Sequence, residues 1–391
     1  MDRRTDLLKR LIATPSQVTV NDPGPVLDCL CDWLTHNDVE YVLVGPSSRP
    51  LAVVINPPSD DESEVLLLDA CLDTAPVGDL DQWTLPPFSG DVRDGWLYGR
   101  GSADSKAAVA VFSELATRVH LSQGVPFSPK RHVTILFDCD EHSGRFGGIR
   151  AYTAQYGYPK YCVIGYPGID EIVAGSRGFY RTTATLRGTL AHAGAGTVPE
   201  ELATNKLAAL LVALRDLPES KVQSDDFPLP PRASVTWIRT GVKSYSITPA
   251  KIDCAIDIRL TPSFGPVEAK AFLERTLQEI DRSEGSRLHS KLSRPSFWPA
   301  YRTPDRALLP SLLQASATRY LKIRPPLRVS GPSNIGNYLA MHGTEMLSGF
   351  GVDYRHIHGP DECIRVESVE TVSNVYADLI ARFLSARASD A

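Results

Sequence analysis

The sequence predicts an α/β protein in which a main domain with a mostly parallel central sheet is interrupted by a smaller inserted α+β domain. Helical and strand-like segments alternate through residues 4–165, which is typical of a parallel sheet covered by helices. From about Arg177 the pattern changes to β-α-β-β-α, which favours a compact α+β domain. The length of 391 residues is sufficient for two such domains.

In the first part of the chain, apolar residues at helical spacing predict helices and short apolar runs predict strands. The predicted helices are 4–14, 24–36, Ala103–His120 and Ile149–Gln155. The predicted strands are Glu40–Val44, Leu51–Ile55, Glu64–Asp69, Val133–Asp138 and Tyr161–Gly165. A run of Asp, Glu and Ser at Ser59–Ser63 is interpreted as a solvated turn.

The predicted insert comprises residues 178–290, and it divides a discontinuous main domain of residues 1–177 and 291–391. Its predicted strands are Phe179–Leu186, Ala233–Thr240 and Lys251–Leu260, and its predicted helices are Ala203–Leu214 and Pro266–Asp281. The segment Lys291–Pro304, in which prolines alternate with aromatic residues, is interpreted as the return crossing into the main domain.

Composition excludes several functional classes. With 41 Lys+Arg against 46 Asp+Glu the net charge is −5, so we expect no nucleic-acid partner. No window approaches 18 uncharged apolar residues, so we expect no membrane partner. The amphipathic start lacks the apolar core of a signal peptide, and the seven cysteines have no C-x-x-C pair, which together predict reduced thiols in the cytoplasm.

Four loops carry side chains capable of chemistry, and three of them follow predicted strands, where open α/β sheets place their sites. They are, in chain order, Cys71 with Asp73, the Gly-rich turn Gly99–Asp104, the cluster Asp140–His142, and the late segment His358–Glu362. Each has a structural alternative when taken singly. The Gly-rich turn lacks both nucleotide-binding patterns, and the acidic cluster is also compatible with a solvated strand end.

The order of these segments resembles the cocatalytic zinc metallopeptidases, a family that includes aminoacylase, acetylornithine deacetylase, succinyl-diaminopimelate desuccinylase and glutamate carboxypeptidase. Successive family segments read H-x-D-T-V-P, G-R-G-x-x-D-x-K-G, D-E-E-x-G, E-P-T and H-x-x-x-E. The matching segments here are Cys71-Leu-Asp73-Thr-Ala-Pro, Gly99-Arg-Gly-Ser-Ala-Asp104-Ser-Lys-Ala, Asp140-Glu141-His142-Ser-Gly, Tyr166-Pro-Gly and His358-Gly-Pro-Asp-Glu362. The resemblance implies a zinc-peptidase-like catalytic domain with an inserted lid and dimerisation domain.

The resemblance implies a ligand set that this sequence only half preserves. In the family two zinc ions share an aspartate, which Asp104 matches; one ion is completed at the positions of His142 and His358. The other ion is completed at the positions of Cys71 and Tyr166, which are not the usual histidine and carboxylate. One zinc per chain is therefore expected, because a carboxylate and two imidazoles suit a four-coordinate zinc with one water. Binding of metal by a Cys71 thiolate and a Tyr166 phenolate stays open as an alternative.

The resemblance also assigns roles to other residues. Glu141 matches the general base, and Asp73 matches the aspartate that orients the ligand at position 71. His192 matches a histidine that reaches the substrate across a homodimer formed by the insert. The candidate substrate contacts are Asn205, Arg259, Ser333, Asn334 and Tyr166.

Two classes of function follow from these residues. The first is a zinc-dependent hydrolase of an amide bond in a small substrate with a carboxylate, such as an N-acyl amino acid or a dipeptide-like molecule. The second is a repurposed relative, either a biosynthetic enzyme that forms or rearranges an amide or related bond, with or without metal and with Cys71 as nucleophile, or a silent binding protein. The retained Asp104, Glu141, His142 and His358 favour the hydrolase.

Overall fold

The computed structural model describes residues 3–59, 64–118, 131–195, 201–217, 224–241, 243–283 and 287–386. The acidic run predicted as a turn lies almost wholly outside these residues, as does the predicted end of one helix at His120. The chain divides into two compact units. Unit 1 comprises Met1–Gly175, Thr303–Arg328 and Asn334–Ala391, and unit 2 comprises Ser176–Arg302 and Val329–Ser333.

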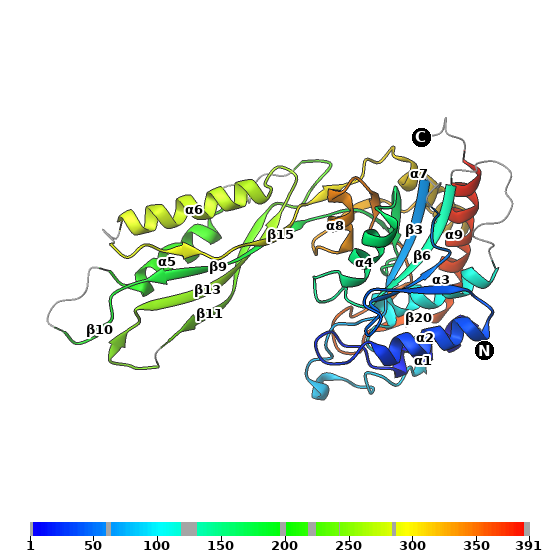
Figure 1. Cartoon of the computed structure of the whole chain (residues 1–391), viewed down its shortest axis with the longest axis horizontal. Helices are drawn as coiled ribbons and strands as arrows, with labels where there is room; N and C mark the ends of the chain where they lie inside the picture. Colours follow the sequence, from blue (N-terminus) through cyan, green and yellow to red (C-terminus); the bar gives the residue numbers. More distant parts are fainter. Residues whose placement is uncertain are drawn as a thin grey trace. The chain divides into compact units, whose positions relative to one another are not determined.

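Unit 1 contains a six-stranded sheet with the order β1-β2-β6-β3-β7-β18 (Figure 1). Its strands are β1 (Tyr41–Val44), β2 (Ala52–Ile55), β6 (Arg131–Asp138), β3 (Glu64–Cys71), β7 (Tyr161–Ile164) and β18 (Glu345–Leu347). The four strands from β6 to β18 are parallel, while β1 and β2 pair antiparallel at one edge. The predicted α/β class with a mostly parallel sheet is confirmed.

The helices of unit 1 are α1 (Arg3–Ala13), α2 (Gly24–His36), α3 (Ala107–Arg118), α4 (Gly147–Tyr156), α7 (Leu308–Leu321), α8 (Ile335–Met341) and α9 (Val366–Ser385). Of these, α1, α2, α3, α7 and α9 contribute side chains to one large apolar core. The rings of Phe112 on α3 and Tyr376 on α9 meet edge to face with centroids 4.8 Å apart. Gly165 lets α3 approach the end of β7, because a Cβ there would lie 2.4 Å from the Cβ of Ala108. None of the described helices is long and apolar enough to cross a membrane.

The helix predicted to begin at Ala103 begins instead at Ala107. The preceding turn, Ser102–Lys106, is bent, and Asp104 within it has extended backbone angles (φ −119°, ψ 92°). The prediction failed because a distant residue reshapes the turn: the backbone N–H groups of Ala103 and Asp104 donate to Glu362 Oε1 at 2.9 and 3.2 Å. Because of this bend, Asp104 lies before the helix and not within it.

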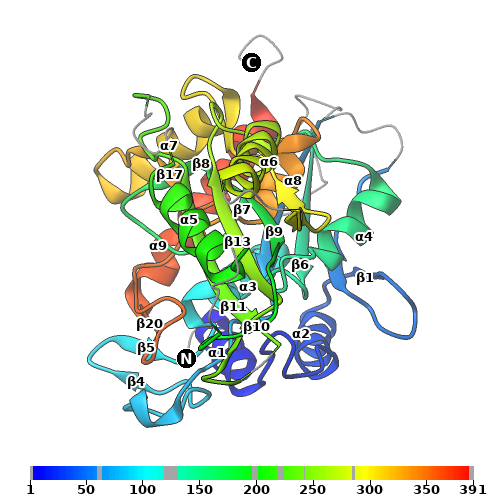
Figure 2. The same ribbon diagram turned by 90° about the vertical axis from the view of Figure 1, so that its left-hand side faces the viewer.

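A small antiparallel sheet in unit 1 was not predicted. Figure 2 displays β4 (Val92–Arg93), β5 (Trp96–Tyr98) and β20 (Cys363–Arg365) side by side, and β19 (Tyr354–Arg355) pairs with β20. The strands are two or three residues long, too short to give a periodic signal. The sheet brings the late loop 356–362 against the Gly-rich turn, where Gly99 N–H donates to Glu362 O at 2.8 Å.

Unit 2 is an antiparallel sheet that packs against two helices (Figure 1). Its strands are β11 (Arg232–Thr240), β13 (Lys251–Leu260), β9 (Gly178–Arg187), β14 (Lys291–Leu292) and β15 (Ser296–Trp298), and its helices are α5 (Ala203–Arg215) and α6 (Pro266–Ser283). A separate ribbon pairs β10 (Ala191–His192) with β12 (Ile247–Thr248). The remaining short strands of the chain are β8 (Ile172–Ser176), β16 (Tyr301–Arg302) and β17 (Leu327–Ser330).

The insert extends past its predicted end at residue 290 and includes residues up to Arg302. The segment interpreted as a return crossing adds β14 and β15 to the edge of β9. Prolines interrupt the alternation in this segment, so its strand character could not be detected from periodicity.

Replacing Phe112 with Ala should lower the free energy of unfolding of unit 1 by about 3–5 kcal/mol, because the buried ring fills the contact between α3 and α9. Urea unfolding followed by circular dichroism measures this loss. Leu80→Ala is the control, since Leu80 is 62% exposed and should change stability by less than about 0.5 kcal/mol. Equal losses in both variants would contradict the assigned core.

Candidate functional site

Three neighbouring parallel strands end at the same edge of the unit 1 sheet, and the residues after them form the centre of the site. Within the order β6-β3-β7, Cys71 pairs in register with Asp138, the last residue of β6. Parallel strands place their carboxyl ends together, so the loops that follow them converge. The carboxyl end of the sheet therefore brings together Cys71 at the end of β3 and Asp73 just after it. Glu141 and His142 follow β6, and Tyr166 follows β7.

The carboxylate of Asp73 fixes the loop that follows β6. Asp73 Oδ1 accepts the backbone N–H of Glu141 at 3.1 Å, and Oδ2 accepts that of His142 at 2.9 Å. Asp73 Oδ2 also lies 3.2 Å from His142 Nδ1, so that the imidazole turns its Nε2 away from Asp73. A carboxylate on one ring nitrogen is the usual support for a histidine that binds metal through the other.

Asp104, His142 and His358 form an acid and imidazole group whose candidate ligand atoms all lie within 4.8 Å of one another. His358 Nε2 is 2.7 Å from Asp104 Oδ2. His142 Nε2 is buried 3.4 Å from the same oxygen, and no described residue makes a hydrogen bond to it. A buried nitrogen without a hydrogen bond beside a carboxylate and a second imidazole is the donor set of a divalent cation such as zinc.

Electrostatics within this group are dominated by burial and opposite charges. Burial alone would raise the pKa of Asp104, but His142 and His358 hold it well below its usual value. Burial alone would lower the pKa of His142, but Asp104 and Asp73 hold it well above its usual value. The negative charges of Asp104 and Asp73 therefore favour positive charge next to them, which either a proton on His142 or a bound cation can supply.

Glu141 lies next to this group and has a pKa near neutrality. Burial raises the pKa of Glu141 to about 7; His142 acts against the rise and the charges of Asp104 and Asp73 add to it. Its Oε2 lies 3.4 Å from His142 Nδ1, and its Oε1 accepts the Tyr166 hydroxyl at 2.6 Å. A carboxyl group of this pKa can accept and return a proton at neutral pH.

Cys71 is buried in the site and pairs with a serine. Its Sγ lies 3.2 Å from Ser105 Oγ and 3.9 Å from Asp104 Oδ1. Burial raises the pKa of the Cys71 thiol well above its usual value; His142 acts against the rise, and the charges of Asp104 and Asp73 add to it. Cys71, Asp73 and His142 form a second compact group, but the oxygens of Asp73 already accept two backbone N–H groups.

Sequence reasoning missed the ion pair that holds two of these loops together. Arg100 Nη1 contacts Glu362 Oε2 at 2.5 Å, and both side chains are almost fully buried. Arg100 Nη2 donates to the carbonyl oxygens of Pro76 and His358, at 3.2 and 3.1 Å. Both residues lie within the quoted motifs, yet spacing alone does not reveal that they pair across 262 positions.

The other predicted site residues lie on other elements of the two units. In unit 2, His192 is exposed on β10 and its Nδ1 accepts Gly194 N–H, and Asn205 is exposed on α5. Also in unit 2, Ser333 Oγ donates to Arg177 O at 2.7 Å. In unit 1, Asn334 caps α8, and its side chain accepts Gly336 N–H at 2.8 Å. Their substrate roles stay predictions.

Arg259 belongs to a group of arginines on the sheet of unit 2. Arg259 Nε and Arg181 Nε both donate to Asp257, at 2.8 and 2.7 Å. Burial lowers the pKa of Arg177, the charges of Arg259 and Arg232 lower it further, and Asp257 acts against this shift. One carboxylate shared among several guanidinium groups leaves net positive charge, which suits an anion.

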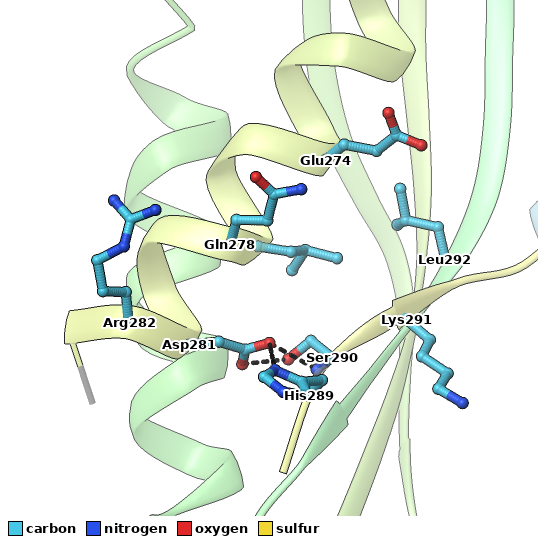
Figure 3. A pocket seen from close by; sticks show the side chains of 9 residues that line it. Glu274, Gln278, Asp281, Arg282, His289, Ser290, Lys291 and Leu292 are labelled. Carbon is cyan, nitrogen blue, oxygen red and sulfur yellow. Dashed lines mark hydrogen bonds and ion pairs between the residues drawn. The ribbon is translucent and has the colours of Figure 1, made fainter. Parts of the chain in front are cut away.

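A pocket of about 770 Å³ lies in unit 2 between α6 and β14 (Figure 3). Asp281 is its most buried polar group, and it is satisfied by Ser290 N–H at 2.7 Å, Ser290 Oγ at 2.9 Å and Lys206 Nζ at 2.8 Å. His289 Nδ1 is 3.8 Å from Asp281 and is highly exposed. These contacts join α5, α6 and the following segment, so we assign them a structural role.

The fold and the acid and imidazole group together define a metal-dependent hydrolase. The chain belongs to peptidase family M20/M25/M40, whose family model matches residues 67–382. This confirms the family resemblance and the expectation of an enzyme that hydrolyses amide bonds in small substrates.

Relatives across the full length agree with this assignment. The chain is 26% identical to the succinyl-diaminopimelate desuccinylase of Hydrogenovibrio crunogenus over 400 residues, which covers 98% of this chain and all of the relative. Among solved structures, aminopeptidase PepT of Bacillus cereus matches with a TM-score of 0.76 at 18% identity, covering 98% of both chains. The YXEP protein of Bacillus subtilis, described as a dinuclear metal-binding peptidase, matches with a TM-score of 0.69 at 13% identity and the same coverage.

Replacing Glu362 with Gln should destabilise unit 1 by about 3–5 kcal/mol, because it leaves the buried Arg100 without its counter-charge. Thermal and urea unfolding measure the loss. The control is Glu367→Gln, whose side chain is 78% exposed and pairs with Arg365 at 3.4 Å, and which should cost no more than about 1 kcal/mol. A wild-type stability for Glu362→Gln would refute the role given to this ion pair.

Proposed function

We propose that this protein hydrolyses the amide bond of a small substrate that carries a carboxylate, of the N-acyl amino acid or dipeptide type, with one zinc ion per chain. The observation that carries the proposal is the buried His142 Nε2, which faces Asp104 and His358, while Glu141 lies beside the other nitrogen of the same ring, Nδ1. The names of the relatives support the substrate class, because succinyl-diaminopimelate is an N-acyl amino acid.

The zinc ion would be held by Asp104, His142 and His358. When bound there, zinc polarises a carbonyl oxygen and lowers the pKa of a bound water. The three protein ligands leave a position open for water or substrate, which is the usual arrangement of a catalytic rather than a structural zinc site.

Two side chains next to the proposed ligands have separate roles, one in orienting a ligand and one in proton transfer. Asp73 keeps the His142 ring oriented through Nδ1 and holds the backbone of the same loop. Glu141 accepts a proton from the attacking water and returns it to the leaving amine, a transfer for which a pKa of about 7 is well suited.

We assign the contacts to substrate on the insert from the resemblance and from the charges of unit 2. Arg259 would hold the substrate carboxylate, with Asn205, Ser333 and Asn334 as further contacts. The exposed His192 of a partner subunit would donate to the oxygen of the scissile carbonyl. The excess of guanidinium groups around Asp257 supports an anionic ligand at Arg259.

The alternative with Cys71 as nucleophile has less support. The thiol is buried, and its pKa is raised well above its usual value although His142 acts against the rise, so the reactive thiolate is disfavoured. The relatives are hydrolases by name, which also counts against a biosynthetic role. All seven cysteines are free, and we keep the cytoplasm as the proposed compartment on the cysteine pattern.

The insert offers a surface for the proposed homodimer. Strand β11 is at the edge of its sheet, so its outer backbone groups are available to another chain. Trp237 and Ile238 on β11 and Leu211 and Val212 on α5 are 39–50% exposed, which is unusual for large apolar side chains. A second copy of the chain is the partner that the resemblance implies for this surface.

Replacing Glu141 with Gln should lower kcat for a cleaved N-acyl amino acid or dipeptide by about 10²–10⁴-fold, because the amide cannot accept a proton. The rate of amine release measures activity, and plasma mass spectrometry measures metal content. We expect about one zinc per chain in the wild type and in Glu141→Gln, and neither zinc nor activity in Asp104→Ala.

The control for this series is Glu40→Gln, an exposed residue of unit 1 that should keep both zinc and activity. Full activity in Glu141→Gln would overturn the assigned base. A wild-type protein that binds no metal when zinc is supplied would overturn the proposed function and return attention to Cys71.

Replacing Val212 with Asp should convert the dimer into a monomer at micromolar concentration, because it buries a charge in the proposed interface. Sedimentation velocity measures the change. Val267→Asp is the matched control, because Val267 is also an exposed valine on a helix of unit 2, and this variant should remain dimeric. A monomeric wild type, or a dimeric Val212→Asp, would exclude this interface.

A further inference from the structure

Tyr166 makes a short hydrogen bond to the residue that we assign as general base. Its hydroxyl donates to Glu141 Oε1 at 2.6 Å, while Glu141 Oε2 lies 3.4 Å from His142 Nδ1. Each oxygen of the carboxylate thus has one neighbour. Glu side chains lose considerable rotamer freedom when they are fixed, so a carboxylate held at both oxygens is one whose position is controlled.

Tyr166 is itself well placed to hold another side chain. It follows β7 directly, one residue after Gly165, whose N–H donates to Asp69 O on β3 at 2.8 Å. The backbone of Gly351 packs against it, because a Cβ at that glycine would lie 2.4 Å from Tyr166 O. A ring attached to a fixed backbone by two rotatable bonds is a rigid donor.

Cys71, the other residue that the resemblance relates to a second zinc ion, also makes contacts within the site. Cys71 N–H donates to Ser105 Oγ at 2.9 Å, and Cys71 Sγ lies 3.2 Å from the same oxygen. Zinc in proteins is bound by thiolate, imidazole and carboxylate, and a tyrosine hydroxyl is not among these usual ligands. Tyr166 therefore offers no carboxylate at the position that the resemblance relates to a second zinc ion, and its hydroxyl is already bonded to Glu141.

We infer that Tyr166 is a positioning residue for Glu141, and that this hydrogen bond takes the place of a second metal ion, so that the site works with one ion. The inference rests on the proposed function and deepens it. In a site with two ions, a metal neighbour helps to hold the reacting groups; here the Tyr166 hydroxyl fixes one oxygen of Glu141, whose other oxygen lies beside His142.

The inference has a kinetic consequence for Tyr166→Phe, which removes only the hydroxyl. Glu141 keeps its carboxylate but gains freedom to rotate, and small displacements of a reacting group cost up to about 10²-fold in rate. We expect kcat to fall by about 10–100-fold with KM unchanged and with one metal ion per chain retained. Tyr158→Phe is the matched control, because Tyr158 bonds only to the Tyr338 hydroxyl and its loss should leave kcat unchanged.

A cobalt(II) titration counts the metal sites without reference to activity. We expect the visible absorbance of the wild type and of Tyr166→Phe to saturate at one equivalent, with no thiolate-to-cobalt charge-transfer band. We expect the double variant Cys71→His/Tyr166→Glu, which introduces an imidazole and a carboxylate, to saturate at two equivalents.

The outcomes separate this inference from the proposed function. Two equivalents of cobalt in the wild type, or a thiolate band, would overturn the inference and the proposed count of one ion per chain, but would leave the proposed amide hydrolysis intact. Saturation of the double variant at one equivalent would also overturn it, if circular dichroism and the Asp104 site are unchanged. A rise in KM for Tyr166→Phe with kcat unchanged would make Tyr166 a substrate contact instead. No cobalt binding in any variant would count against the proposed function itself.

Discussion

The carboxylate of Glu362 joins the two loops on which the metal site depends. Its Oε1 accepts the backbone N–H groups of Ala103 and Asp104, and its Oε2 pairs with Arg100, which in turn holds the carbonyl oxygen of His358. Asp104 and His358 are 254 residues apart, and this buried ion pair is what brings them within 2.7 Å. Because both charges are almost fully buried, neither loop can move without exposing an unpaired charge to a low dielectric.

The same end of the sheet also holds two buried carboxyl groups whose pKa values are shifted strongly upward. Burial raises the pKa of Asp138 to about 8 and that of Asp69 well above its usual value. Both oxygens of Asp69 lack a hydrogen-bond partner among the described residues. Perturbed carboxyl groups of this kind cluster at functional sites, where a cation can balance them. The electrostatics of unit 1 therefore agree with the family assignment independently of any motif.

Two positions that the resemblance relates to a second zinc ion are altered in the same way. Each of the two altered positions, Cys71 and Tyr166, carries a neutral group that hydrogen-bonds within the site, to Ser105 and to Glu141. In the group formed by Asp104, His142 and His358, Asp73 orients the ring of His142 through its Nδ1. One half of the site is thus organised by hydrogen bonds between neutral groups, and the other half by the carboxylate and imidazole groups of Asp104, His142 and His358.

Local pattern in the sequence determined most of the architecture. The periodicity around Leu7 to Ile12 and the apolar runs of β3 and β6 specify these elements to within a few residues, because buried faces repeat at the period of the helix or strand. The ends of the parallel strands also located Cys71, Asp73, Glu141 and His142 near one another, since strand direction is a local property.

Only the tertiary structure decided the details that depend on distant partners. The bend at Asp104, the pair of Arg100 with Glu362 and the hydrogen bond from Tyr166 to Glu141 each join residues from separate elements. The strands β14 and β15 exist because β9 offers them an edge, not because their own sequence is strand-like. Such features arise from contacts between segments far apart in the chain, and no periodicity within one segment encodes them.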